Sequence, residues 1–183
     1  FDILPLDLND PSNVVTVSTD QTVRGFVYNG EEQYPAINSV TVKTKVGDTT
    51  KELTLSANDY DVVPGEGNLT SVGKHNLAIS GKGDYKGSVT EAVAYTIDPA
   101  KLSEDLVNVS VKDYVYDDAI NAQKVKDLIT VTDKATEQEL DFDVVLLDWP
   151  ENTTKPVQDI GTYRVRIKAN ANTTNFEADS YID

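Results

Sequence analysis

The sequence has no cysteine and no methionine, and it has only one histidine and one tryptophan. Without cysteine the chain has no disulfide, no thiolate nucleophile and no zinc–thiolate site. His75 leaves no histidine pair for a metal ion and a single candidate for a histidine base. We therefore expect a protein that is not an enzyme, with no cofactor, no catalytic residue and no metal site.

Basic charge and long apolar runs are also scarce. The 16 Lys and Arg residues face 31 Asp and Glu residues, for a formal net charge of -15. Nucleic-acid and anionic-membrane binders need clustered basic residues, so we expect neither partner. No run approaches the ~20 apolar residues of a membrane span, and the first residues lack a signal-peptide layout. Because the chain starts at Phe1 without methionine, we expect a mature or excised piece whose export and anchoring signals lie elsewhere.

β-branched residues are abundant: 23 Val, 9 Ile and 19 Thr make up 51 of the 183 residues. Such side chains favour pleated, half-buried strands. Val15 and Val17 alternate with polar residues, and the same pattern recurs in short segments along the chain. Turn residues separate these segments, which is typical of antiparallel sandwiches. Residues 120–129 are the exception, because Ala122–Leu128 can form two helical turns.

Turn glycines and tyrosines add detail to this expectation. Gly30 and Gly81 occupy positions where a tight turn with positive φ is expected. Tyr28 and Tyr60 occupy strand positions in which the ring is buried and the hydroxyl lies at the rim.

An internal repeat organises the chain. Segments of the first half recur in the same order in the second half at shifts of 94, 88 and 82 residues, and the changes of shift indicate insertions and deletions at loops. Both copies end in an Ile-Asp pair, Ile97-Asp98 and Ile182-Asp183. The matched segments include Val15 with Val109, Val27-Tyr28 with Val115-Tyr116, 59–63 with 141–145, Leu77 with Val165, and Ile79 with Ile167. We therefore predict an all-β chain of two tandem Ig-like antiparallel β-sandwich domains, 1–98 and 99–183, with a short helix possible in the second.

The repeat resembles the MBG/YDG-type Ig-like modules of bacterial cell-surface proteins and adhesins. The residues that carry the resemblance are 27–30, Pro35, 58–62, 72–73, 77–79, 81–87 and 95–97 in the first copy, and 115–118, 141–144, 160–165 and Phe176 in the second. The second copy departs from the pattern, since Gly81-Lys82-Gly83 is replaced by 169–174. The resemblance implies an extracellular or secreted protein that is attached to the cell surface by other parts of the parent protein. It implies no catalytic residues.

The leading functional hypothesis is therefore a non-catalytic module that serves as a stalk, display or adhesion unit. Its expected partners are neighbouring repeats of the same chain and a host glycan or surface protein, and the chain is expected to be a monomer. The alternative is a carbohydrate-binding accessory module of a secreted polysaccharide-capture or polysaccharide-degrading system. That alternative depends on Trp149, a ligand-binding candidate because a loop aromatic flanked by carboxylates can stack on a sugar ring.

Other candidate sites have simpler structural interpretations. His75 shares a face with Leu77 and Ile79 and is replaced by Tyr163 in the second copy, so we expect a partly buried filler. Calcium would need six to eight oxygen ligands from a tight loop, whereas the acidic pairs supply two each. A Lys–Asn or Lys–Asp isopeptide cross-link would need a buried lysine, and the candidate lysines are predicted to face outward. The pairs are Asp59/Asp61, Asp117/Asp118 and Asp141/Asp143, and the lysines are Lys43, Lys45 and Lys112.

A basic row is expected on the strand after Gly161. Arg164, Arg166 and Lys168 alternate with apolar residues there. We predict that a hairpin places this row opposite Asp141 and Asp143, with cross-strand pairs worth roughly 0.2–1 kcal/mol each.

Overall fold

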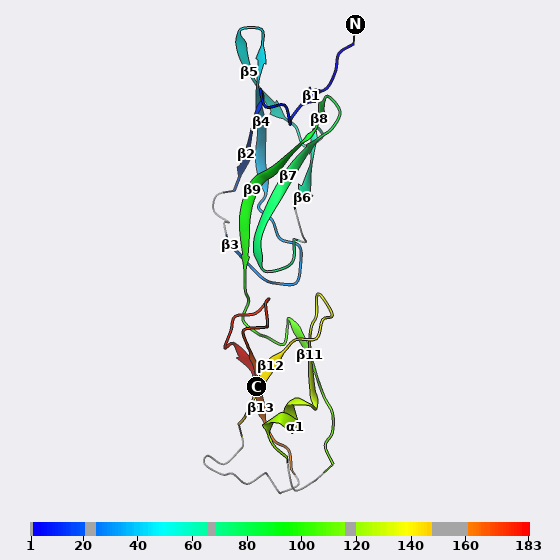
Figure 1. The fold of residues 1–183 in the computed structure, drawn as a ribbon, viewed down its shortest axis with the longest axis vertical. Helices are drawn as coiled ribbons and strands as arrows, with labels where there is room; N and C mark the ends of the chain where they lie inside the picture. Colours follow the sequence, from blue (N-terminus) through cyan, green and yellow to red (C-terminus); the bar gives the residue numbers. More distant parts are fainter. Residues whose placement is uncertain (1, 21–24, 66–68, 116–119, 148–160) are drawn as a thin grey trace. The chain divides into compact units, whose positions relative to one another are not determined.

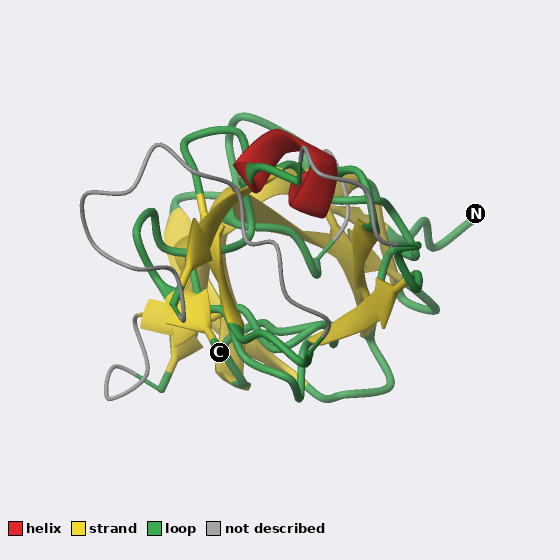
Figure 2. Ribbon diagram, turned by 90° about the horizontal axis from the view of Figure 1, so that it is seen from below, coloured by secondary structure: helices red, strands yellow, loops and turns green. Residues whose placement is uncertain are grey.

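A computed structural model describes residues 2–20, 25–65, 69–115, 120–147 and 161–183. They form an all-β, sandwich-type fold with one short helix among them (Figures 1 and 2). The chain divides into two compact units: unit 1 is Phe1–Phe26 with Glu32–Asp98, and unit 2 is Val27–Glu31 with Pro99–Asp183. The short segment 27–31, which the repeat assigns to the first copy, therefore belongs to unit 2. Nowhere in the described part of the chain is a helix both long and apolar enough to cross a membrane.

Unit 1 contains two antiparallel sheets, and a short parallel pair accompanies them. The sheets have the strand orders β2-β4-β5 and β3-β9-β7-β6, and the parallel pair is β1-β8. The strands are β1 (Leu6–Asp7), β2 (Val14–Thr19), β3 (Gly25–Val27), β4 (Ile37–Val46), β5 (Thr49–Leu55), β6 (Tyr60–Pro64), β7 (Gly73–Gly81), β8 (Tyr85–Lys86) and β9 (Ser88–Asp98).

The core of unit 1 lies between these two sheets. Val40 and Val42 of β4 and Ile79 of β7 are fully buried, and Leu8 and Leu55 complete the cluster. Val15 and Val17 pack against it from β2, as the predicted alternation requires. Residues that alternate along a strand thus place one apolar face inward and one polar face in solvent.

The turn glycines follow the prediction only in part. Gly30 has φ of +80°, as predicted, but Gly81 does not have positive φ; in this turn Gly83 and Gly87 have it instead. Gly81 is the last residue of β7. Glycine is required there because a side chain would not fit. A Cβ at Gly81 would lie 3.0 Å from the backbone nitrogen of Lys86.

Unit 2 contains a two-stranded sheet, β10-β11, and a three-stranded sheet, β12-β13-β14. Its elements are β10 (Val107–Val111), α1 (Ala122–Lys126), β11 (Ile129–Asp133), β12 (Phe142–Leu146), β13 (Val165–Ala169) and β14 (Tyr181–Ile182). The predicted helix is confirmed as the single turn and a half of α1. The Asn121 side chain caps it by accepting a hydrogen bond from Lys124 N at 3.0 Å.

The two halves repeat each other's strand pairings. One parallel pairing and two antiparallel pairings correspond between the halves. Four of the six residues follow the shifts found in the sequence, whereas Tyr85 and Val42 are related to their counterparts by shifts of 91 and 89. The matching pairs are Leu6↔Tyr85 with Ala100↔Phe176, Val15↔Val42 with Val109↔Val131, and Val62↔Ile79 with Val144↔Ile167. Leu77 and Val165 occupy corresponding positions in these registers.

The ends of the two copies do not correspond, contrary to the prediction. Ile182 pairs with Ile167. The counterpart of Ile167 in unit 1 is Ile79, and it pairs with Val89 rather than with Ile97. Ile182 thus takes the place of Val89, and the two Ile-Asp pairs are not equivalent in the strand pairings.

Candidate functional sites

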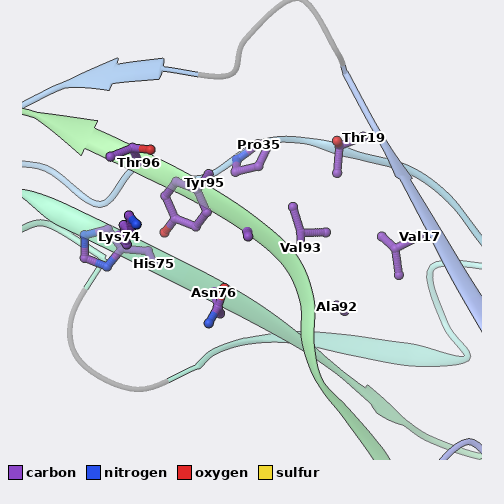
Figure 3. Close-up of a pocket in the computed structure, with 11 residues that line it drawn as sticks. Val17, Thr19, Pro35, Lys74, His75, Asn76, Ala92, Val93, Tyr95 and Thr96 are labelled. Atoms are coloured by element: carbon purple, nitrogen blue, oxygen red, sulfur yellow. The ribbon is translucent and has the colours of Figure 1, made fainter.

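A cavity of about 630 Å³ opens in unit 1 between β2 and the strands β7 and β9 (Figure 3). This volume is in the range of small-molecule pockets. The described residues that line it are mostly small, apolar or hydroxyl-bearing, and none is a carboxylate. They are Val17, Thr19, Pro35, Lys74, His75, Asn76, Ala92, Val93, Ala94, Tyr95 and Thr96.

His75 and Tyr95 form the aromatic part of this lining. Their rings stack with centroids 5.4 Å apart, and Phe26 meets the Tyr95 ring edge-on at 5.7 Å. His75 is only 7% exposed and its Nε2 lies 2.7 Å from the Ser71 carbonyl, so Nε2 is the donor. His75 is therefore a buried packing residue, as the sequence suggested.

Tyr95 contributes a polar group to the cavity whose capacity to form hydrogen bonds is not used within the described fold. Its hydroxyl is buried and has no hydrogen-bond partner among the described residues. Burial raises the pKa of this phenol, with a further contribution from Glu32, so it stays protonated at neutral pH. The described lining thus offers hydrogen-bonding groups, among them the buried Tyr95 hydroxyl.

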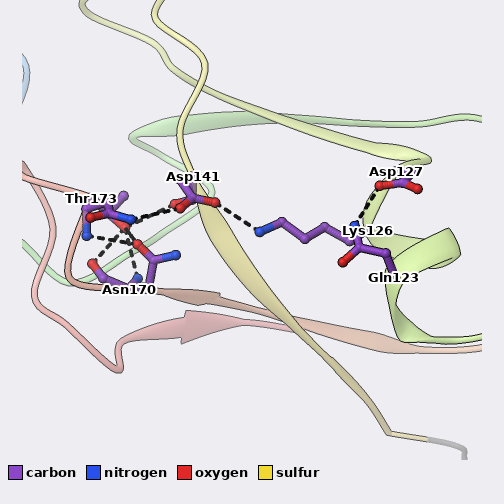
Figure 4. Close-up of polar contacts among 7 residues, drawn as sticks. Gln123, Lys126, Asp127, Asp141, Asn170 and Thr173 are labelled. Carbon is purple, nitrogen blue, oxygen red and sulfur yellow. Dashed lines mark hydrogen bonds and ion pairs between the residues drawn. The ribbon is translucent and has the colours of Figure 1, made fainter.

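A second polar cluster surrounds Asp141 in unit 2 (Figure 4). One carboxylate oxygen accepts from Lys126 Nζ of α1 at 2.9 Å, and the other accepts from Asn172 Nδ2 at 3.0 Å. The Thr173 hydroxyl lies 3.1 Å from the Asp141 carbonyl. Hydrogen bonds from Asn172 and Lys126 hold the pKa of Asp141 well below its usual value.

This cluster brings a lysine, a carboxylate and an asparagine together, which are the groups of an isopeptide cross-link. Amide formation needs a neutral amine and a neutral carboxyl group whose hydroxyl leaves as water, and burial favours the neutral form of both groups. Here the side chains of Lys126 and Asp141 are 32% and 47% exposed, and the lowered pKa keeps Asp141 ionised. The arrangement is an ion pair that connects α1 to the start of β12. The three lysines considered from the sequence for such a cross-link, Lys43, Lys45 and Lys112, are all exposed.

The most deeply buried polar cluster of unit 2 is centred on Asp133, which is 0% exposed. The Tyr28 hydroxyl donates to its carboxylate at 2.7–2.8 Å, Asn175 Nδ2 donates at 3.1 Å, and the backbone N–H of Ala135 donates at 2.9 Å. The Tyr28 ring packs edge-on against Phe176 at 5.7 Å. Burial and the bond to Asp133 raise the pKa of the Tyr28 phenol well above its usual value. The hydroxyl thus lies inside unit 2 and not at a rim.

Asp133 is the buried group that the sequence interpretation missed. It follows Ile129 and Val131 at alternate positions of β11, so its parity points to the core. A carboxylate at an inward position of an alternating strand is the signal that could have identified it.

The acidic pairs behave as structural groups where they are described. Asp59 accepts hydrogen bonds from the backbone N–H and hydroxyl of Ser56, both at 2.7 Å, and Asp61 pairs with Lys82 at 2.6 Å. Within the described ranges there is no group of three or more acidic or histidine residues that could hold a metal ion. Asp117, Asp118 and the ligand candidate Trp149 lie outside the described residues.

The predicted hairpin of basic and acidic rows forms, but its ion pairs are different. β12 and β13 pair antiparallel with Asp143 opposite Lys168. Among the described residues, Lys168 pairs with Asp179 at 2.5 Å and Arg166 pairs with Asp183 at 2.6 Å, and both carboxylates come from the segment that follows β13. β14 lies on the side of β13 opposite β12. The ion pairs of Arg166 and Lys168 therefore connect β13 with the segment around β14.

Comparisons of the chain with models of protein families, with curated proteins and with solved structures find no match to any of them. The internal repeat is therefore the one template against which each half of this molecule can be interpreted.

Proposed function

We propose that the chain is a non-catalytic repeat module of a larger bacterial surface protein, acting outside the cell as a stalk, display or adhesion unit. The observation that supports this most is the repetition of strand pairings between the two halves. Arrays of similar β modules are a common way to build a long protein, because each copy adopts the same fold and adds a similar length.

The chemistry of the described polar groups is in keeping with this role. The carboxylates of Asp59, Asp133 and Asp141 are engaged by donors from the surrounding fold. The strong acidity of the chain keeps such a module well solvated and disfavours association. The sequence resemblance to MBG/YDG-type modules points in the same direction.

The proposal is tested by joining one, two and four copies of the chain and measuring the radius of gyration by small-angle X-ray scattering. A stalk gains length nearly in proportion to copy number. A compact assembly of four copies would grow only about 1.7-fold, following the scaling of globular domains. Growth near the compact value contradicts a stalk.

Glycan-array binding by the chain and by Trp149→Ala addresses the carbohydrate-binding alternative. Specific binding that the substitution abolishes would replace the stalk proposal with a glycan-binding module. Binding that is absent in both proteins keeps the stalk or display role.

A further inference from the structure

Asn29 is the only asparagine of the chain that is followed by glycine. Glycine has no side chain that could hinder its own backbone nitrogen, and attack of that nitrogen on the preceding side-chain amide is the general route by which asparagine loses ammonia. Both residues belong to segment 27–31 of unit 2, in which Tyr28 is buried and Asn29 is exposed. The surroundings of each reacting group can therefore be followed in the structure.

The electrophile of this reaction is the side-chain carbonyl carbon of Asn29. Its oxygen accepts a hydrogen bond from the backbone N–H of Glu31 at 2.9 Å, which makes an Asx turn. The ring that this hydrogen bond closes contains both Cγ of Asn29 and the backbone nitrogen of Gly30. The Glu31 N–H also faces the oxygen that becomes negatively charged when the amide is attacked, so it acts as an oxyanion donor.

The nucleophile and the leaving group are not held by other bonds. Among the described residues, neither the backbone N–H of Gly30 nor the side-chain NH2 of Asn29 has a hydrogen-bond partner. The reaction therefore breaks no hydrogen bond of the fold at either group, and the exposed NH2 can leave directly into solvent. The turn thus binds the carbonyl oxygen and leaves the other two reacting groups free.

We propose that Asn29 is a self-modification site of the folded chain, and that its isoaspartate product weakens the contact between Tyr28 and Asp133. The Gly30 nitrogen forms a bond to Cγ of Asn29, the Cγ–Nδ2 bond breaks, and the proton of the Gly30 N–H leaves with the NH2 group as ammonia. Water then opens the cyclic imide. Opening at Cγ gives aspartate, and opening at the main-chain carbonyl gives isoaspartate, in which the backbone runs through Cβ and Cγ.

The isoaspartate form lengthens the main chain by one atom between two residues that are held in place. Tyr28 is 2% exposed, and its hydroxyl donates to the Asp133 carboxylate at 2.7–2.8 Å. On the other side of Asn29, a Cβ at Gly30 would lie only 2.9 Å from the Cβ of Ala135, so the turn has little free space. A longer main chain must therefore displace Tyr28 or Gly30, and we expect the hydrogen bond to Asp133 to weaken.

The first test compares the full chain with a free peptide of residues 25–33, which has the same Asn-Gly sequence without the fold. Both are incubated in one slightly alkaline buffer, and mass spectrometry that distinguishes aspartate from isoaspartate gives the rate at Asn29. The exposed Asn58, which aspartate follows, is the internal control. We expect Asn29 to react at least as fast in the chain as in the peptide, and about tenfold faster than Asn58 or more. A slower reaction in the chain than in the peptide overturns the proposal.

The second test measures the consequence for unit 2. Ion exchange separates the isoaspartate form, which has gained a carboxylate, and amide hydrogen exchange of β11 then reports on the surroundings of Asp133. We expect these amides to exchange severalfold faster in the isoaspartate form than in the unmodified chain. Asn29→Asp is the matched control, because it adds the same charge to a main chain of normal length, and it should exchange like the unmodified chain. Equal exchange in the isoaspartate form and in Asn29→Asp overturns the proposed effect on Tyr28.

Discussion

Unit 1 and unit 2 place different groups at the same position of the sandwich. Val42 of β4 corresponds to Val131 of β11, and two residues further on unit 1 has Thr44 where unit 2 has Asp133. The apolar core cluster of unit 1 comes entirely from its own copy. Unit 2 buries a carboxylate and obtains one of its donors, Tyr28, from the other copy. The comparison teaches that a shared set of strand pairings tolerates a buried charge where enough donors surround it.

The largest effect should come from removing Tyr28. Tyr28→Ala deletes a buried ring and a donor to Asp133, and we expect a loss of about 3–5 kcal/mol in the stability of unit 2. Tyr28→Phe keeps the ring and should cost about 1–3 kcal/mol, because Asp133 loses one hydrogen bond. Hydrogen exchange of β11 and β13 amides measures both losses.

The half-exposed Tyr34 gives the matched control, and Tyr34→Phe should change little. If Tyr28→Ala left the amide hydrogen exchange of β11 unchanged, segment 27–31 would not contribute to the stability of unit 2.

Gly30→Ala should have the next largest effect. Gly30 has φ of +80°, and an added Cβ would lie 2.9 Å from the Ala135 Cβ. Gly47 also has positive φ, +62°, but its added Cβ would meet nothing within 4 Å. Gly47→Ala therefore measures the backbone term alone, about 1–2 kcal/mol. Chemical denaturation should show Gly30→Ala costing about 1 kcal/mol or more beyond that, and equal costs would contradict the close contact.

Acid should weaken unit 2 through Asp141. Its pKa is lower in the folded chain than in the unfolded chain, where an aspartate has a pKa of about 3.9. Its contribution to stability is therefore fully present well above that value and is lost as the pH falls below about 4. Asp141→Asn should flatten the fall in melting temperature between neutral pH and pH 2, whereas Asp143→Asn should retain it. Identical acid profiles for the two variants would rule out this role.

The smallest effect is expected at the end of β14. Asp183 accepts two hydrogen bonds from the Arg166 guanidinium, at 2.6 and 2.9 Å, and this guanidinium also lies 3.7 Å from the centre of the Tyr181 ring. Because the pair is exposed, Asp183→Asn should speed amide exchange at Ile182 without measurably shifting global unfolding. A clear fall in the melting temperature would show that β14 contributes more to unit 2 than its two paired residues indicate.

The sequence predicted the strands well, because one-sided burial imposes a period of two that can be seen without a structure. The alternation at Val15 and Val17, the pairing of β12 with β13, and the burial of His75 are confirmed for this reason. The short helix is confirmed too, and its Asn121 cap is the local signal that favours it.

The failures share a different cause, since each depends on a contact between segments far apart in sequence. Gly81 was assigned to a positive-φ turn, whereas β8 approaches it too closely for a side chain. The acidic partners of Arg166 and Lys168 were sought in the preceding strand, while β14 brings them from the following one.

Segment 27–31 has a consequence for how such modules can follow one another. The stretch that is duplicated in the sequence and the stretch that folds as one body differ by these five residues. A gene rearrangement that replaced residues 99–183 with another module would keep Tyr28 and Gly30 in the first copy. The new neighbour would then have to offer an inward-facing acceptor for the phenol and a small residue opposite the glycine, as Asp133 and Ala135 do here. The choice of a second module is thereby restricted at this junction, because only a module with a matching acceptor and a small residue could replace residues 99–183.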